Sequence, residues 1–461
     1  MEAVNKQENK KLPLKMKMGY LVGSMGTQMM LIMYMYYQLF FYTDVLGISA
    51  GAASTIVLIA RVWDFINDPI MGIIVDKTHK KGGGCRFFIK IMTVPLGIFF
   101  VLSFAAPNLS NGMKVVWAAV TYIGQGMCNT ALQTPRNTLT VKCTKDNNHQ
   151  RVNLQQFSSV GSHIGSMIVP AITMPLIGII SGENIKQGFL VMTAVYALIM
   201  IVFNLFLYKA SEGLEDEDYE VEKAPKVKAM DCIKALLSNK LCLIIALCQL
   251  VYLILSSLFG TALTFYFTYN IGNVNLMSVV TTISSLVGII PVFVMHIVTD
   301  KLGNFKTAML GILCAIFGLS IRFVFHDASL PVIIIGNALY SLGTGFFSSV
   351  TFLCVMESID YGVWKTGKKG PLAIYVTAYT FAAKAGLAFG GVVAGYILMA
   401  IKYVPNAATQ TASVLAWLFR LTVTIPLISF IIIAIIFIGV IKVANKLPQI
   451  REELKSRELA D

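Results

Sequence analysis

Charged side chains are scarce in this chain of 461 residues: Asp, Glu, Lys and Arg make up 13% of it, whereas hydrophobic residues make up 56%. An ordinary soluble domain contains about 25% charged residues. The chain therefore has too little polar material for a surface in water, and its mean hydropathy of +0.71 agrees with this. These shortages exclude a soluble globular protein and indicate that lipid surrounds most of the surface.

Metal-binding, disulfide and catalytic patterns are also missing from the sequence. The eight Cys are mostly scattered through apolar segments without a CxxC pair, which is typical of small apolar side chains in helices. No HExxH, P-loop or GxSxG sequence occurs in a plausible context. We therefore expect neither an enzyme nor a resident cofactor. No cleavable signal-peptide pattern precedes the first apolar segment, so we expect that segment itself to direct membrane insertion.

Long apolar segments are what the chain has in abundance. A bilayer core of about 30 Å requires about 20 apolar residues in a helix, whereas a strand of a membrane barrel needs only about 10 alternating residues. The sequence therefore predicts an all-α membrane protein with twelve transmembrane helices, near residues 18–43, 50–75, 88–106, 114–140, 156–180, 187–208, 241–269, 275–298, 307–324, 331–355, 371–399 and 414–441.

The positive charges are distributed unevenly along the chain. Most of the Lys and Arg lie in the two tails and in every second loop, for example Lys80 and Lys368. The intervening loops contain only Lys114, Lys186 and Lys402. Because Lys and Arg concentrate in cytoplasmic loops, we predict a multi-pass protein of the cell (inner) membrane with both termini in the cytoplasm. The net charge of +13 is explained in this way without nucleic acid as a partner.

A polar, charged stretch divides the chain near its middle. The predicted organisation is a cytoplasmic N-terminal tail (1–17), a six-helix bundle (18–208), a cytoplasmic linker (209–240), a second six-helix bundle (241–441) and a cytoplasmic C-terminal tail (442–461). An internal repeat favours two pseudo-symmetric halves, because GIIVDK at 72–77 is followed half a chain later by DKLG at 300–303. Many secondary transporters are built from such halves. The alternative is that both copies are merely basic cytoplasmic loops.

Three polar side chains share one face of the second predicted helix. Asp64, Asn67 and Asp68 are spaced i, i+3 and i+4 and lie near the middle of the span. A charge at this depth costs at least about 2.5 kcal/mol, and two carboxylates so close together repel each other. A bound Na⁺ or Li⁺, or a shared H⁺, would relieve the repulsion. Thr130, in the middle of the fourth helix, could supply a hydroxyl oxygen to the same cation.

A single ammonium group lies in the eleventh predicted helix. Lys384 cannot remain charged in lipid without a partner, and the two carboxylates are its natural counterions. Two carboxylates, one ammonium and one monovalent cation have a net charge of zero, which favours cation-coupled transport. The alternative is that Asp64, Asp68 and Lys384 only hold helices together. Arg61 can pair with an acid or extend to the membrane surface.

Other polar residues at membrane depth are candidates for contact with a transported solute. Gln28 and Gln133 lie at mid-helix and could bind either the solute or another helix. Arg136 could clamp a carboxylate, or it could extend toward cytoplasmic water, which we favour. Tyr34 lies inside the first span, six residues beyond Gln28, where its ring could stack on a sugar.

The same residues resemble a known transporter family. The segments FYTDVLG at 41–47, ARVWDFINDPIMG at 60–72, AKAG around Lys384 and YVPN at 403–406 are similar to the glycoside–pentoside–hexuronide:cation symporters, and the match runs through nearly the whole chain. The resemblance implies the major facilitator fold and Na⁺-, Li⁺- or H⁺-driven sugar uptake by alternating access. It also places that family's cation site on Asp64, Asn67, Asp68 and Thr130, with Lys384 beside it.

The family's sugar site matches less well. Where a well-known member binds galactosyl hydroxyls with two carboxylates, this chain has Gln28 and Gln133, and Asn137 replaces a stacking Trp. Amides can hydrogen-bond to hydroxyls, but they cannot provide the charge-assisted bonds of carboxylates. The pocket is thus expected to be polar, while the case for α-galactosides is weakened.

The leading hypothesis is a cation-coupled symporter for a sugar or glycoside, with the solute, a monovalent cation and the lipid bilayer as its partners. An alternative keeps the fold but changes the solute to an anionic, hexuronide-like or non-sugar molecule. A third hypothesis is a membrane sensor or exporter without cation coupling. The C-terminal tail of 20 residues leaves little room for a signalling domain, which argues against a sensor.

Overall fold

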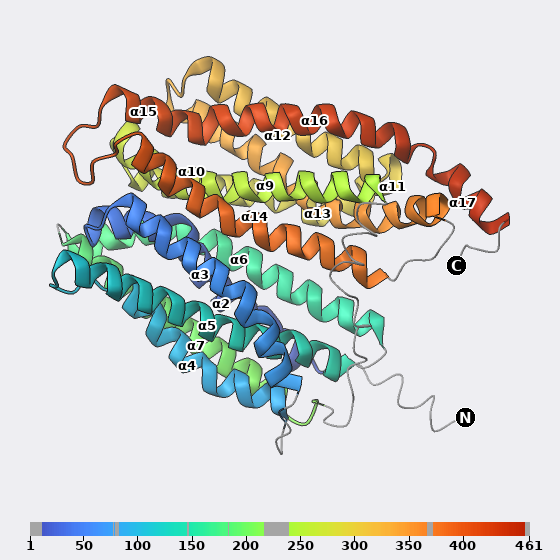
Figure 1. Cartoon of the computed structure of the whole chain (residues 1–461), viewed down its shortest axis with the longest axis horizontal. Coiled ribbons are helices and arrows are strands. Elements are labelled where there is room, and N and C mark those ends of the chain that lie inside the picture. The colour runs from blue at the N-terminus through green and yellow to red at the C-terminus, as the bar shows by residue number, and fades with distance from the viewer. Residues whose placement is uncertain are drawn as a thin grey trace. The chain divides into compact units, whose positions relative to one another are not determined.

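Every regular element that the structure describes is a helix, as the sequence predicts (Figure 1). The structure is a computed structural model, and it describes residues 12–76, 78, 83–144, 147–182, 184–215, 239–366 and 372–456. Most of the predicted N-terminal tail, most of the linker 209–240 and the end of the C-terminal tail lie outside the described residues. Lys77, Lys80 and Lys368 also lie outside them.

The first part of the chain consists of long helices joined by short connections. Its elements are α2 (Leu14–Phe40), the π-helical turn η1 (Phe41–Val45), α3 (Ala50–Asp76), α4 (Gly84–Ser103), α5 (Asn111–Thr144), α6 (Asn148–Ser181) and α7 (Ile185–Ala210). Short polar side chains cap several of these helices. For example, the side chains of Asn147 and Asn184 accept hydrogen bonds from the backbone N–H groups of the first turns of α6 and α7.

The second part of the chain has the same character. Its elements are α9 (Lys240–Phe265), η2 (Tyr266–Asn270), α10 (Asn275–Gly288), α11 (Ile290–Leu302), α12 (Asn304–Phe325), α13 (Leu330–Thr366), α14 (Leu372–Ala400), α15 (Ala412–Phe419), η3 (Arg420–Thr424), α16 (Ile425–Ala444) and α17 (Leu447–Ser456). Pro291 explains the break between α10 and α11, because proline lacks the N–H that a continuous helix needs.

Nine segments of the described residues are long and apolar enough to cross a membrane. The other three long helices, α2, α3 and α5, coincide with the first, second and fourth predicted spans. They are more polar because they contain the candidate site residues; α3 alone includes Arg61, Asp64 and Asp68. The prediction of a multi-pass helical membrane protein is therefore confirmed, and the count of twelve spans stays a prediction.

By packing, the chain forms two compact units. The first contains Met1–Lys223 and Gly395–Ala408, and the second contains Ala224–Ala394 and Thr409–Asp461. The segment Gly395–Ala408 thus packs with the first unit, although we expect it from the sequence to belong to the second bundle. This difference shows that chain order alone does not decide with which unit a segment packs.

Asp44 provides the physical reason for the placement of this segment. Its side chain lies in η1, and the residue is only 7% exposed. The Tyr403 hydroxyl donates to its two oxygens at 2.6 and 2.7 Å, and the Asn406 backbone N–H donates at 3.2 Å. These residues belong to the FYTDVLG and YVPN segments, so two motifs that are far apart in the sequence meet at one buried carboxylate.

Glycines allow close packing around α2 in the first unit. A Cβ added to Gly161 on α6 would collide with the carbonyl oxygen of Leu21, and one added to Gly26 would lie 2.8 Å from the Met200 Cα atom on α7. Close approach of helix backbones through small residues is typical of membrane bundles. Gly26 and Gly161 therefore serve the contacts of α2 with its neighbours.

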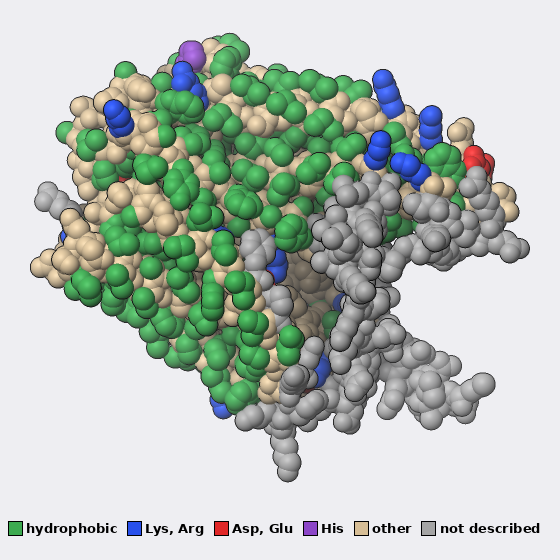
Figure 2. Space-filling model, viewed as in Figure 1, with side chains coloured by type: hydrophobic (Ala, Val, Ile, Leu, Met, Phe, Trp, Pro, Cys, Tyr) green, Lys and Arg blue, Asp and Glu red, His purple; other side chains and the backbone are tan. Residues whose placement is uncertain are grey.

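The second unit has an aromatic core and an apolar exterior. Tyr252, Phe347 and Phe430 are at most 8% exposed and meet at steep angles in its interior. On the outside, Phe317 of α12 and Ile435 of α16 are more than half exposed. Figure 2 shows hydrophobic side chains spread over the visible face of α16, with Lys and Arg near its two ends. Such a surface suits a bilayer and not water.

Candidate functional site

The strongest candidate site lies where α3 and α5 pack together in the first unit. Three side chains of α3 face three residues of α5. On each helix the three residues are spaced about one helical turn apart. The residue numbers rise together along both helices, so α3 and α5 run parallel here. We call this set the α3–α5 cluster, and it consists of Arg61, Asp64 and Asp68 on α3 with Tyr122, Gly126 and Thr130 on α5.

Asp64 lies in the middle of the α3–α5 cluster. Its Oδ2 atom accepts a hydrogen bond from Arg61 at 3.3 Å, and the other end of the Arg61 guanidinium donates to the Tyr122 hydroxyl, also at 3.3 Å. Gly126 leaves room for the carboxylate, because a Cβ there would lie 3.0 Å from Oδ1 of Asp64. Of the two roles open to Arg61, the structure therefore shows pairing with an acid.

Asp68 lies at the end of the same cluster. Thr130 donates its hydroxyl hydrogen to Oδ1 of Asp68 at 2.9 Å. The contact brings together two residues that sequence reasoning placed in one site from different helices. A threonine hydroxyl retains lone pairs after donating its hydrogen, so it can still contribute an oxygen to a bound cation.

Two amide side chains beside the cluster have buried atoms without hydrogen bonds. Nδ2 of Asn67 and Oδ1 of Asn129 are both buried and have no hydrogen-bond partner in the structure. Asn67 precedes Asp68 in α3, and Asn129 precedes Thr130 in α5. A buried polar atom without a partner is costly, and the Asn129 oxygen is of the kind that a cation can use. Asn129 is therefore a further candidate oxygen donor, next in sequence to Thr130.

The chemistry of this donor set fits a small hard cation. The available ligands are carboxylate, hydroxyl and amide oxygens, which Na⁺ and Li⁺ prefer to nitrogen or sulfur. Arg61 neutralises one carboxylate charge, which leaves a net charge of −1 on the α3–α5 cluster. A single monovalent cation or proton would remove that charge. The charges of the cluster residues alone therefore sum to a value that one monovalent cation would balance.

Lys384 lies in α14 and is exposed. It belongs to the second unit, whereas both carboxylates belong to the first. Its pairing with Asp64 and Asp68 therefore stays a prediction.

The two glutamines predicted to contact the solute have similar surroundings. Gln28 on α2 and Gln133 on α5 are both half-buried, and neither forms a hydrogen bond with any residue that the structure describes. Gly165 on α6 makes room for Gln28, whose Cβ would lie 3.3 Å from a Cβ at that position. The alternative role in interhelical hydrogen bonding is not observed among the described residues. Both amides are available to bind hydroxyl groups.

Asn137 lies one turn beyond Gln133 on α5. Its side chain is exposed, and no hydrogen bond ties it to the described part of the chain. It is more accessible than Gln133.

The sequence favours an Arg136 side chain that extends toward cytoplasmic water. The structure differs, because Arg136 is buried and only 5% exposed. Its guanidinium donates to the hydroxyls of Ser24 and Thr27 on α2 and of Ser158 on α6. Hydroxyl groups on and beside α2 thus solvate a charge that would otherwise need water. No carboxylate pairs with Arg136 within the described residues.

Tyr34 lies in the core of the first unit and is 9% exposed. Its hydroxyl is 2.6 Å from Ser103 Oγ, and its ring packs among Phe100, Phe104 and Tyr122 with centroids 5.4–5.6 Å apart. No ring face is left for a sugar in this arrangement. We therefore leave Tyr34 out of the solute site.

Sequence reasoning missed Tyr122 and Gly126, which lie opposite Arg61 and Asp64. A signal for both existed, because Tyr122, Gly126 and Thr130 follow one another at intervals of four residues and so share a helix face. Once Thr130 is placed opposite Asp68, the residues four and eight positions earlier fall opposite Asp64 and Arg61. That inference requires α3 and α5 to be adjacent and parallel, which only the structure provides.

Comparison with known proteins agrees with this architecture. A family model described as MFS/sugar transport protein matches residues 19–440. The isoprimeverose transporter of Lactiplantibacillus pentosus is 31% identical over 430 residues, which cover 92% of this chain and 88% of that protein. The putative glycoside/cation symporter YagG of Escherichia coli (strain K12) is 27% identical, over 97% of this chain and 95% of that one.

A solved structure shows the same fold. The crystal structure of the nucleoside transporter NupG superposes with a TM-score of 0.61 and covers 94% of this chain and 100% of that chain. At 14% sequence identity the likeness concerns the fold alone.

Proposed function

Because this chain belongs to the MFS/sugar transport protein family, which consists of transporters and not of enzymes, we propose that it is a symporter. It takes up a sugar or glycoside together with Na⁺, Li⁺ or H⁺ by alternating access. The observation that supports cation coupling is the α3–α5 cluster, in which two carboxylates lie on one face of α3 and a threonine hydroxyl of α5 contacts one of them. The uneven distribution of Lys and Arg supports an inner-membrane orientation with both termini in the cytoplasm.

The coupling mechanism follows from charge balance in a medium of low dielectric constant. Arg61 neutralises Asp64, so the net negative charge of the cluster is carried by Asp68. We assign two alternative counterions to that charge, the cargo cation in the loaded state and the Lys384 ammonium in the empty state. Release of the cation would then let Lys384 take its place, so that the Asp68 carboxylate is not left bare while the carrier resets.

The solute path is assigned to Gln28, Gln133 and Asn137. Their amides have no hydrogen-bond partner in the described structure and can both donate to and accept from sugar hydroxyls. Gln133 on α5 lies three residues after Thr130, so the sugar and the cation would bind to one helix about a turn apart. Binding of one ligand would orient the helix for the other.

Uptake into proteoliposomes tests the proposed function. With one-to-one coupling, we expect a tenfold inward Na⁺ gradient to drive about tenfold accumulation of the transported sugar. The free energy of such a gradient is about 1.4 kcal/mol, which corresponds to a concentration ratio of about ten. Isoprimeverose is the first solute to try, since the transporter named for it shares 31% identity with this chain. A Na⁺ ionophore and protein-free liposomes are the controls. Uptake that ignores both the Na⁺ gradient and the pH gradient would reject the proposal.

An anionic solute is the second candidate, and Arg136 is the observation that favours it. The guanidinium is buried, lies three residues from Gln133 and has no acid partner in the described residues. A carboxylated sugar would complete its charge balance, as in a hexuronide.

Arg136→Gln should then reduce uptake of a hexuronide by about tenfold or more, because a hydrogen bond to a charged group contributes about 1.5–3 kcal/mol. Uptake of the matching neutral sugar should change little, and Arg136→Lys should retain part of the activity toward the hexuronide. Equal losses for the charged and the neutral sugar would instead assign Arg136 to helix packing alone.

A further inference from the structure

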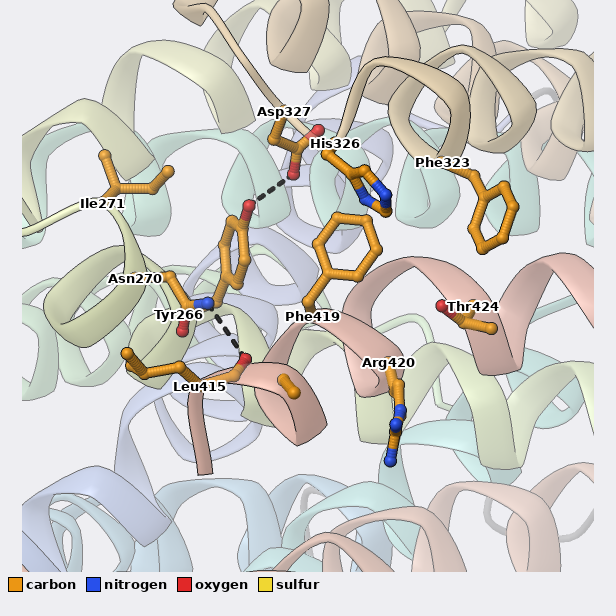
Figure 3. A pocket seen from close by; sticks show the side chains of 11 residues that line it. Tyr266, Asn270, Ile271, Phe323, His326, Asp327, Leu415, Phe419, Arg420 and Thr424 are labelled. Carbon is orange, nitrogen blue, oxygen red and sulfur yellow. Dashed lines mark hydrogen bonds between the residues drawn. The ribbon is translucent and has the colours of Figure 1, made fainter. Parts of the chain in front are cut away.

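The second unit contains a pocket that lies outside the cation and solute sites. Its volume is about 560 Å³, which is within the range of small-molecule sites, about 300–1,000 Å³. It opens where η2, the end of α12 and the start of the last membrane helix come together (Figure 3). The lining side chains used below are Tyr266, Asn270, His326, Asp327, Phe419 and Arg420.

The acidic residue in this pocket is already neutralised. Both oxygens of Asp327 accept hydrogen bonds from the buried Arg322, at 3.0 and 2.6 Å, and the Tyr266 hydroxyl donates to the same carboxylate at 2.5 Å. Figure 3 shows this last bond at one side of the pocket. Asp327 therefore has little remaining attraction for a cationic ligand.

Arg420, in contrast, has an uncompensated charge. It is exposed and forms no ion pair with the residues that the structure describes; its guanidinium lies 5.1 Å from the centre of the Trp417 ring. The rings of His326 and Phe419 have centroids 5.4 Å apart and line the pocket beside Tyr266 (Figure 3). The lining thus offers one positive charge among aromatic rings.

One lining residue has an unused hydrogen-bond acceptor. Asn270 donates through Nδ2 to the backbone oxygen of Leu415 at 3.0 Å, while its Oδ1 atom is buried without a partner. Because that oxygen is buried, a ligand hydroxyl could reach it only after a rotation of the Asn270 amide. The pocket therefore suits a molecule with an anionic group for Arg420, and a hydroxyl on that molecule could turn the Asn270 amide toward itself.

The surface that adjoins the pocket is strongly apolar. The last turn of α12 exposes Val324 by 69% and Phe325 by 57%, and the first turn of α16 exposes Ile428 by 52%. These residues lie on helices whose outer faces are covered by hydrophobic side chains. A free sugar or phosphate would make no use of this surface, whereas fatty acyl chains would lie along it.

We propose that this pocket binds the headgroup of an anionic glycerophospholipid, such as phosphatidylglycerol. The phosphodiester lies against Arg420 and Trp417, a headgroup hydroxyl donates to Asn270, and the acyl chains follow α12 and α16. A guanidinium binds a phosphate through charge-assisted hydrogen bonds, and Trp is common at the bilayer boundary. The site would anchor the start of the last membrane helix in the lipid, a role distinct from transport of the solute.

Quenching of Trp417 fluorescence by brominated lipids tests the proposal. The protein is the full chain with Trp63, Trp117 and Trp364 replaced by Phe, in mixed detergent micelles. The two probes have the same brominated acyl chains and differ only in the headgroup: phosphatidylglycerol and diacylglycerol. We expect phosphatidylglycerol to quench at about fivefold lower mole fraction than diacylglycerol.

Substitutions show whether that preference comes from the pocket. Arg420→Gln should abolish the preference for phosphatidylglycerol, whereas Arg420→Lys should keep most of it. The matched control is Lys186→Gln, which removes an exposed cation at a helix start in the first unit. An unchanged preference in Arg420→Gln, or an equal loss in Lys186→Gln, would overturn the proposal.

Two competition experiments distinguish binding of a lipid from binding of a soluble ligand. Competition by inorganic phosphate would mean that the pocket takes a free anion, and competition by a neutral disaccharide would mean that it is a saccharide site; either result overturns the lipid proposal. Native mass spectrometry of the chain with all four Trp retained provides an independent measurement. It should find fewer bound phosphatidylglycerol molecules on Arg420→Gln than on Lys186→Gln.

Discussion

Asp68→Asn should abolish cation-driven accumulation of the solute while leaving membrane insertion intact. The substitution preserves the shape of the side chain and lets Thr130 keep a hydrogen-bond partner, so the α3–α5 packing should survive. What is lost is the one carboxylate charge in the cluster that Arg61 does not neutralise. At about 4 Å and an effective dielectric constant of about 20, that charge attracts a monovalent cation by about 4 kcal/mol. Cation affinity should therefore fall by about a thousandfold.

Two measurements check this prediction. Accumulation in proteoliposomes with a Na⁺ gradient reports the loss of coupling, and the dependence of the melting temperature on Na⁺ reports cation binding directly, because a ligand stabilises the state that binds it. Na⁺ or Li⁺ should raise the melting temperature of the native chain and have no effect on Asp68→Asn.

The matched control is Glu452→Gln, which removes one negative charge from an exposed position in α17. It should behave as the native chain in both measurements. Accumulation by Asp68→Asn at the native level would show that the cation binds elsewhere. A normal response of its melting temperature to Na⁺, with transport lost, would assign Asp68 to the conformational change and not to cation binding.

The position of Asp68 could be predicted because local rules determine it. Helical spacing places Asp64 and Asp68 on one face, and the cost of burying charge marks that face as unusual. The opposing residues could not be predicted from local rules alone. Placing Thr130 opposite Asp68 sets the rotation of α5 only if α3 and α5 are adjacent and parallel, and only the structure shows that they are.

The surroundings of Arg136 and Tyr34 likewise could not be predicted from the sequence. The sequence offers Arg136 a route to cytoplasmic water, but the structure surrounds it with hydroxyls of α2 and α6. Three serine and threonine side chains, each ordinary in the sequence, become a solvating shell only when the helices assemble. Tyr34 is in the interior of the first bundle, yet helix rotation directs its ring toward Phe100 and Phe104 and leaves no face for a solute.

The contact between Asp44 and the segment Gly395–Ala408 illustrates long-range pairing. The FYTDVLG and YVPN segments resemble family motifs, but a sequence motif does not indicate which distant residues it contacts. A buried carboxylate needs donors, and Tyr403 and Asn406 supply them from 359 and 362 residues away along the chain. Hydrophobic periodicity contains no information about such a pair.

Arg322→Gln should strongly destabilise the second unit. Arg322 is fully buried and forms a bidentate ion pair with Asp327, whose own side chain is 2% exposed. It also donates to Asn337 Oδ1 at 3.0 Å. Removing one member of a buried ion pair leaves an uncompensated charge, which costs about 3–5 kcal/mol. The free energy of unfolding, measured by denaturant titration in detergent, should fall by about that amount.

The double variant Arg322→Met with Asp327→Asn separates lost charge balance from lost packing. It removes both charges, and Asn tolerates the left-handed backbone conformation that Asp327 adopts at φ 51°. Its stability should exceed that of Arg322→Gln, since a neutral pair leaves no bare carboxylate in the core. Arg420→Gln, which removes an exposed cation from the same pocket, should be nearly neutral in detergent. If the double variant were the least stable of the three, packing and hydrogen bonds to Asn337 would outweigh the ion pair, and the electrostatic explanation would be wrong.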